Sequence, residues 1–176
     1  MYKRQGDLDI SFLYGPTHDL HLRCKELLYE DIALISAPGK LKGLGKEIKL
    51  TDIAHLPIVL PSRPHGIRIL VDNATAKAGV KLNVAISGDA FEVLKSLVKT
   101  GNYHAFIPFS AINEDLSEGT LEARTFVSPT IKRQLILAMA PERKNTRAAQ
   151  SALKIVTNEI EKMVKEGIWK AELVVN

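Results

Sequence analysis

The sequence has very little cysteine, and this scarcity narrows the class of protein. Cys24 is its one cysteine, which excludes an internal disulfide and is typical of a reducing compartment. A lone thiol with no neighbouring base in the sequence indicates a structural residue rather than a catalytic nucleophile. Aromatic residues make up only 6% of the chain, and no basic tract interleaved with aromatics is present. The net charge of +4 is spread along the chain and gives little support to nucleic-acid binding by these residues.

Long apolar runs are absent as well. No stretch approaches the roughly 20 residues that a membrane-spanning helix needs. Residues 1–7 carry charge with no apolar segment after them, unlike a signal peptide. We therefore expect a cytoplasmic protein with no membrane association. A chain of 176 residues that is 45% hydrophobic and 25% charged is long enough for one domain or two small lobes with a real core.

The most informative stretch runs from Pro61 to Arg68. It follows the short apolar run 58–60, which predicts a strand, and it precedes apolar residues at helical spacing. Ser62 is a favoured N-cap residue, and Gly79 is suited to the end of the helix. We therefore expect a strand, a tight turn and a helix. The apolar residues that set this spacing are Ile67, Leu70, Val71, Ala74 and Ala78.

This predicted helix start carries several cationic groups. The first N–H groups of a helix are unpaired, and the helix dipole adds partial positive charge there. Arg63, His65 and Arg68 add charge or potential charge beside them. The sequence therefore predicts a site for a small anion that uses these three residues and Ser62. The alternative is a capped surface helix with solvated arginines.

Strand and helix signals alternate along the rest of the chain. Strands are expected at 10–14, 31–37, 82–86, 103–107, 121–127 and 132–140, and residues 20–29 are ambiguous between strand and turn. A helix after residue 88 is expected to begin with a capping box, because Asp89 precedes Glu92 by three residues. Further helices are expected at 110–116 and 146–166, the last with one apolar stripe. This alternation predicts an α/β fold with a mostly parallel sheet and helices on both faces.

Several short motifs, taken in order, carry a family resemblance. They are Gly6-Asp7-Leu8-Asp9-Ile10, the strand 28–38 that leads to a proline, the segments 50–59 and 97–108, and Gly119-Thr120-Leu121 with Pro129-Thr130-Ile131-Lys132-Arg133. Together they resemble the effector-binding domain of LysR-type transcriptional regulators over nearly the whole chain. Tyr103 departs from the pattern, because the family usually has a second glycine there. The stretch 60–68 is similar to the branch that includes the nitrogen-assimilation control regulators.

The resemblance implies a periplasmic-binding-protein-like (type II) fold of two α/β lobes joined by two crossing strands. Residues 1–37 and 131–176 would form the first lobe, and residues 38–130 would form the second. The family's N-terminal winged helix-turn-helix and linker helix have no counterpart in this sequence. The first strand and helix of the family's effector domain also have no counterpart here. We therefore expect the first lobe to be incomplete.

The resemblance also implies a sensory function. A small effector, expected to be a carboxylate or another anion, would bind between the lobes and bias their relative angle. A homo-oligomer would pass this change to DNA-binding domains, and DNA would be contacted only through the absent N-terminal domain. The family implies further effector-binding residues at the start of the next helix and at the crossover, namely Gly88, Asp89, Ala90, Ser128 and Pro129. For Asp89, the alternative is that it only caps its helix.

Two other function classes fit the sequence less well. A solute-binding protein of the same fold would need export, and no export signal is visible. A small hydrolytic enzyme would need more than Ser62 and His65, since no nucleophile elbow, third catalytic member or oxyanion loop accompanies them. His55, His65 and His104 do not have metal-ligand spacing with carboxylates or Cys24. We therefore expect no enzymatic activity, no cofactor and no metal.

The first prediction is that this chain alone does not bind DNA selectively. It offers no recognition helix, which would contact the bases, and no basic stripe, which would bind the phosphate backbone of a duplex. A gel-shift assay with genomic fragments at moderate salt should show only weak, sequence-independent binding. Selective binding at sub-micromolar concentration would contradict this prediction.

Overall fold

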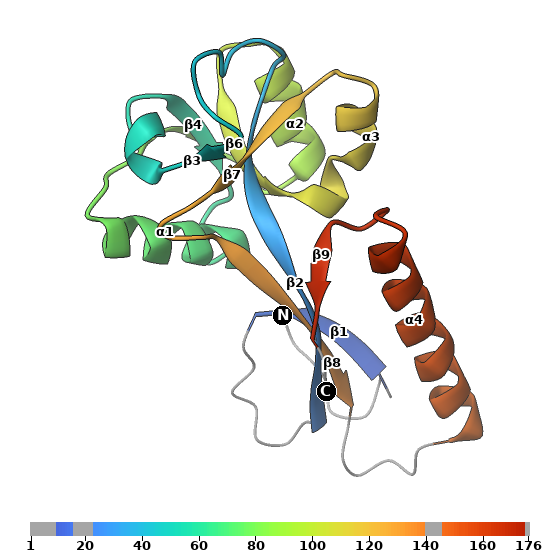
Figure 1. Cartoon of the computed structure of the whole chain (residues 1–176). Coiled ribbons are helices and arrows are strands. Elements are labelled where there is room, and N and C mark those ends of the chain that lie inside the picture. Colours follow the sequence, from blue (N-terminus) through green and yellow to red (C-terminus); the bar gives the residue numbers. More distant parts are fainter. Residues whose placement is uncertain (1–9, 16–22, 140–145, 175–176) are drawn as a thin grey trace. The chain divides into compact units, whose positions relative to one another are not determined.

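The computed structural model describes residues 10–15, 23–139 and 146–174. The chain divides into two compact units: unit 1 comprises residues 1–30 and 134–176, and unit 2 comprises residues 31–133 (Figure 1). The motif at Gly6–Asp9 lies outside the described residues. No helix in the described ranges is both long and apolar enough to span a bilayer.

The sheet of unit 2 is built around the long strand β2, which belongs to unit 2 from residue 31 onward. β2 pairs antiparallel with β6 and β7, whereas β4 pairs in parallel with both β5 and β6, and β3 pairs in parallel with β7. The sheet is therefore mixed, and the prediction of a mostly parallel sheet was wrong because it overlooked the antiparallel pairing of β2. These strands are β2 (Arg23–Ser36), β3 (Glu47–Ile48), β4 (Pro57–Leu60), β5 (Asn83–Ser87), β6 (His104–Pro108) and β7 (Glu122–Phe126).

Helices α1 (Gly66–Ala78) and α2 (Phe91–Lys99) cover opposite faces of this sheet. Successive strand residues point to opposite faces, so each strand contributes alternately to two core clusters. One cluster joins the strands to α1 through Ile32, Leu34, Ile58, Leu60, Phe106, Ile67, Val71 and Ala74. The other joins them to α2 through Ala33, Ile35, Val59, Ala105, Ile107, Leu94 and Val98. The prediction of helices on both faces is confirmed.

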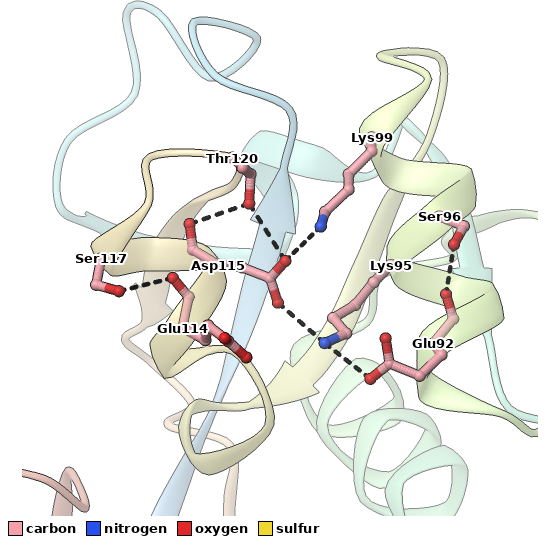
Figure 2. Close-up of polar contacts among 8 residues, drawn as sticks. All are labelled: Glu92, Lys95, Ser96, Lys99, Glu114, Asp115, Ser117 and Thr120. Atoms are coloured by element: carbon pink, nitrogen blue, oxygen red, sulfur yellow. Dashed lines mark hydrogen bonds and ion pairs between the residues drawn. The ribbon is translucent and has the colours of Figure 1, made fainter.

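Short helices complete unit 2. η1 (Leu50–Ile53) precedes β4, and the helix expected at 110–116 is divided into η2 (Phe109–Ala111) and α3 (Asn113–Ser117). Asp115 on α3 is buried, with 7% of its side chain exposed. Its carboxylate accepts hydrogen bonds from Lys95 at 3.0 Å and from Thr120 at 3.2 Å, and it forms an ion pair with Lys99 (Figure 2). These contacts attach α3 to α2.

The charge of Asp115 depends on these lysines. Burial alone would raise the pKa of this carboxyl group, but hydrogen bonds from Lys99 and Lys95 outweigh burial and lower the pKa below its usual value. Lys95 also forms an ion pair with Glu92 at 2.8 Å, and its pKa is raised because its two carboxylate partners outweigh desolvation. The folded state therefore favours the charged form of both partners.

Unit 1 contains the remaining strands and the longest helix. β1 (Ile10–Tyr14) pairs antiparallel with β8 (Lys132–Met139), of which residues 134–139 belong to unit 1, and β9 (Ala171–Leu173) pairs antiparallel with β2. β2 begins at Arg23, which resolves most of the segment that the sequence left ambiguous as strand. The core of the unit is formed by Leu27, Leu28, Leu135, Leu137 and Ile160.

Helix α4 (Arg147–Lys165) begins at the cap residue Thr146, whose side chain accepts a hydrogen bond from the Ala149 N–H. Its predicted apolar stripe is only partly buried. Ile160 is the one buried residue of the helix, while Val156 of the stripe is 38% exposed. The described strands of unit 1 cover chiefly the second half of the helix.

The second prediction concerns Asp115→Asn. The substitution leaves the largely buried Lys95 with Glu92 alone, so the free energy of unfolding at pH 7 should fall by about 2–3 kcal/mol. Because the pKa of Asp115 is lowered in the folded state, its contribution is present above the ordinary carboxyl pKa of about 4 and is lost as the pH falls through the lowered value. The free energies of unfolding of the wild type and of Asp115→Asn should therefore become equal in acid.

Urea unfolding at a series of pH values measures this difference. Glu114→Gln is the matched control, because Glu114 is exposed on the same helix and should change stability by less than about 0.5 kcal/mol. Equal stability of wild type and Asp115→Asn at pH 7 would contradict the role given to Asp115.

Candidate functional site

The carboxyl ends of β4 and β5 lie side by side and carry most of the predicted site. In their parallel pairing, Leu60 is opposite Ser87, and the Gly88 N–H donates to the Leu60 carbonyl at 3.1 Å. The segments that follow these two strands are therefore adjacent, as expected for parallel strands. They contain seven of the nine predicted residues: Ser62, Arg63, His65, Arg68, Gly88, Asp89 and Ala90.

Helix α1 is capped by His65 and not by Ser62 as predicted. The His65 N–H donates to the Ser62 carbonyl at 3.0 Å, which closes a turn and places the helix start three residues later than expected. His65 Nδ1 accepts a hydrogen bond from the Ile67 N–H at 3.2 Å, so this nitrogen carries no proton in the observed arrangement. The ring also meets Phe91, the first residue of α2, edge to face with 6.0 Å between ring centroids. His65 thus links the two helix starts.

The two arginines of the predicted site share one carboxylate, Asp72. Arg63 Nε donates to Asp72 at 2.7 Å and Arg68 Nε donates to it at 3.0 Å. Arg68 also donates to the Pro61 carbonyl at 3.3 Å. The Arg68 side chain is only 11% exposed, whereas that of Arg63 is 67% exposed. Arg68 is therefore a fixed part of the framework, and Arg63 is the more accessible of the two.

Asp72 was not predicted as part of the site. Its spacing of four residues from Arg68 is the signal that could have identified it, since residues four apart on a helix face each other. Burial alone would raise the pKa of Asp72, but hydrogen bonds from Arg63 and Arg68 outweigh burial and lower it. Asp72 is therefore held in its charged form and neutralises part of the positive charge that the sequence indicated.

Asp89 does not cap α2, so the predicted capping box and the alternative reading of Asp89 as a mere cap were wrong. The cap position belongs to Ala90, and no side chain caps this helix. Asp89 instead accepts a hydrogen bond from the Ser62 N–H at 2.8 Å. The pairing of β4 with β5 brings this N–H within reach, which local sequence spacing cannot reveal. Glu92, the expected partner in the capping box, pairs with Lys95.

Ser128 and Pro129 follow strand β7 and lie on a different segment of unit 2. Ser128 has a positive φ of 53°, and the bond that joins it to Pro129 is cis. Among the described residues, no hydrogen bond or ion pair joins these two to the other seven. Their membership of the site stays a prediction.

A separate polar group lies at the amino-terminal end of β6. Ser36 on β2 is opposite Glu122 on β7, and the β2–β6 pairing places His104 close to Ser36. Ser36 Oγ and His104 Nδ1 are both buried, and neither has a hydrogen-bond partner in the structure. Burial lowers the pKa of His104 against the opposing effect of Glu122. Within the described ranges, no group of three or more histidine, cysteine or acidic residues could hold a metal ion.

The chain belongs to the LysR substrate binding domain family, whose model matches residues 3–161. The predicted family and the α/β fold class are confirmed. The assignment of the chain to the branch that includes the nitrogen-assimilation control regulators stays a prediction.

Several curated relatives are named as transcriptional regulators, and one that matches 89% of this chain at 26% identity is named as the phosphonates import ATP-binding protein PhnC of Anaeromyxobacter dehalogenans. The chain is 25% identical over 166 residues to the HTH-type transcriptional regulator BbuR of Bordetella bronchiseptica, a match that covers 93% of this chain and 50% of that protein. It is 27% identical over 147 residues to a probable RuBisCO transcriptional regulator of Trieres chinensis, covering 78% of this chain and 47% of that one. The chain thus spans about half the length of these relatives.

Solved structures share the fold at low identity. The regulatory domain of Synechocystis CcmR, in complex with 2-PG, matches with a TM-score of 0.75 at 16% identity, over 86% of this chain and 73% of that one. The effector-binding domain of QuiR, in complex with shikimate, matches with a TM-score of 0.72 at 15% identity, over 88% and 72%. A reduced form of OxyR from N. meningitidis matches with a TM-score of 0.73 at 16% identity, over 97% and 77%.

The third prediction concerns Asp72→Asn. The substitution removes the carboxylate that both arginines share, so the free energy of unfolding should fall by about 1–2 kcal/mol. It also frees positive charge at the surface, so added sulfate should raise the melting temperature of the variant more than that of the wild type.

Thermal unfolding at increasing sulfate concentration, with chloride at matched ionic strength, separates this effect from general screening. Glu47→Gln is the control, because it removes a negative charge from the exposed residue Glu47 of the same unit. An equal response to sulfate in both variants would show that Asp72 does not neutralise the arginines.

Proposed function

We propose that this chain is the effector-sensing regulatory domain of a LysR-type transcriptional regulator. The observation that carries the proposal is the family match over residues 3–161 together with the polar site at the carboxyl ends of β4 and β5. Ligands of open α/β sheets bind at strand carboxyl ends, and helix starts there offer N–H donors. The site residues proposed are Ser62, Arg63, His65, Arg68, Gly88, Asp89, Ala90, Ser128 and Pro129.

The proposed activity is binding rather than catalysis. A bound effector shifts the balance between conformations by the difference of its affinity for them, and no bond needs to be made or broken. We propose that residues 1–37 with 131–176, and residues 38–130, act as the two lobes of the family fold. The shift would be passed to DNA through a DNA-binding domain outside these residues, in a cytoplasmic homo-oligomer.

The ligands named for two structural neighbours support a small polar effector. CcmR is described in complex with 2-PG and QuiR in complex with shikimate. A solute-binding protein of the same fold is the less favoured alternative, because the relatives at 25% and 27% identity are named as transcriptional regulators. An enzyme is disfavoured for the same reason and because His65 Nδ1 is occupied by the Ile67 N–H.

The fourth prediction tests the site by substitution. Arg63→Ala should weaken the binding of a small carboxylate about tenfold or more, because a hydrogen bond to a charged group contributes roughly 1.5–3 kcal/mol. It should leave the fold intact, since the Arg63 side chain is 67% exposed. Ser62→Ala should also leave α1 intact because His65 caps the helix. Arg68→Ala should weaken binding and stability together, because Arg68 is 11% exposed and bonded to Asp72.

A calorimetric screen of small mono-, di- and tricarboxylates on the wild type and these variants makes the measurement. Lys81→Ala is the control, because Lys81 is an exposed cation of the same unit outside the site. A carboxylate that binds the wild type and all three site variants equally well would place the effector site elsewhere.

A further inference from the structure

The charged groups at the candidate site balance one another. Arg63 and Arg68 contribute two positive charges, and Asp72 and Asp89 contribute two negative charges. The site is therefore not the cationic pocket that the arginines alone indicated. A plain anion that enters it meets a carboxylate as well as a guanidinium.

Several of the donors that would attract an anion already have acceptors within the chain. The Ile67 N–H donates to His65 Nδ1, and the Ser62 N–H donates to Asp89. The Nε groups of both arginines donate to Asp72. A ligand carboxylate would have to displace Asp89 to reach the Ser62 N–H, and the displaced carboxylate would then repel it.

Asp89 presents an acceptor that a ligand can use. Its Oδ1 is fixed by the Ser62 N–H at 2.8 Å, and the residue is exposed. Because one oxygen is held by the backbone, the second is offered to solvent in a defined orientation. A carboxylate oxygen accepts hydrogen bonds and cannot donate them, so it selects a hydroxyl or an ammonium group.

Arg63 directly follows Ser62, whose N–H is bonded to Asp89, and its side chain offers hydrogen-bond donors instead of acceptors. It contacts Asp72 through Nε, and its side chain is 67% exposed. The terminal nitrogens of the guanidinium provide a fork that suits a carboxylate. A donor group of the ligand would face Asp89 and its carboxylate would face Arg63, on the two segments that the Ser62–Asp89 hydrogen bond joins.

We propose that Asp89 is a specificity-determining residue that selects hydroxy acids and amino acids over carboxylic acids without a donor group. The proposal rests on the proposed function and deepens it, because it names the chemical class of effector. This specificity would come from a charge-assisted hydrogen bond to Asp89, which a ligand without a donor group cannot form.

Succinate, malate and aspartate test the proposal because they share one four-carbon dicarboxylate frame. Malate adds a hydroxyl and aspartate adds an ammonium group. Wild-type protein should bind malate or aspartate at least about tenfold more tightly than succinate, as measured by calorimetry. Which of the two binds better identifies the donor.

Two variants separate the role of Asp89 from folding. Asp89→Asn keeps an oxygen that accepts from Ser62, so its melting temperature should stay near that of the wild type. It should lose the preference for aspartate over succinate to within about threefold, because an amide does not attract an ammonium group as a carboxylate does. Asp89→Ala should lose the preference for malate as well. Glu118→Gln removes a charge from an exposed residue of the same unit and should change neither preference.

The outcomes distinguish the two proposals. In one outcome, the wild type binds the three compounds equally, Arg63→Ala weakens their binding and Asp89→Asn does not change it. The proposed selectivity is then overturned and the proposed function stands. If none of the compounds binds while a carboxylate lacking a hydroxyl or amino group does, the selectivity is likewise overturned. If no small carboxylate of any kind binds, both proposals are overturned.

Discussion

The two-sided burial of β2 is the constraint from which the rest of unit 2 follows. Residues Ile32–Ser36 are buried on both faces of the sheet, so each face needs a helix to cover it. Helix α1 covers one face and α2 the other, and each follows a parallel strand directly. Because parallel strands end at the same edge, both helices begin there. The position of the candidate site is thus a consequence of how the core is covered.

Much of unit 2 could be predicted from local signals. Short continuous apolar runs mark the central strands, and the spacing of Ile67, Val71 and Ala74 marks α1. Gly79 ends that helix in the left-handed conformation with φ 64°, as its residue type indicates. Since each parallel strand is followed by its helix, the sequence also indicated which segments meet at the sheet edge.

The partners within the site could not be predicted, because they depend on register and on side chains distant in sequence. Asp89 and Ser62 are 27 positions apart and meet only through the pairing of β4 with β5. Local spacing assigned both of them to helix caps, and the structure gives neither that role. The same limit applies to α4: its periodicity was clear, but how much of its apolar face is covered depends on elements elsewhere in the chain.

Unit 2 is formed from one continuous stretch of chain, whereas unit 1 is assembled from two separate stretches. The Ile32 N–H donates to the Ile131 carbonyl at 2.8 Å, so the polypeptide leaves and re-enters unit 1 at adjoining points. During synthesis on the ribosome, all strands and helices of unit 2 emerge before helix α4 and strand β9. The candidate site can therefore be assembled cotranslationally while the second half of unit 1 is still being translated, which makes unit 2 a nested folding module.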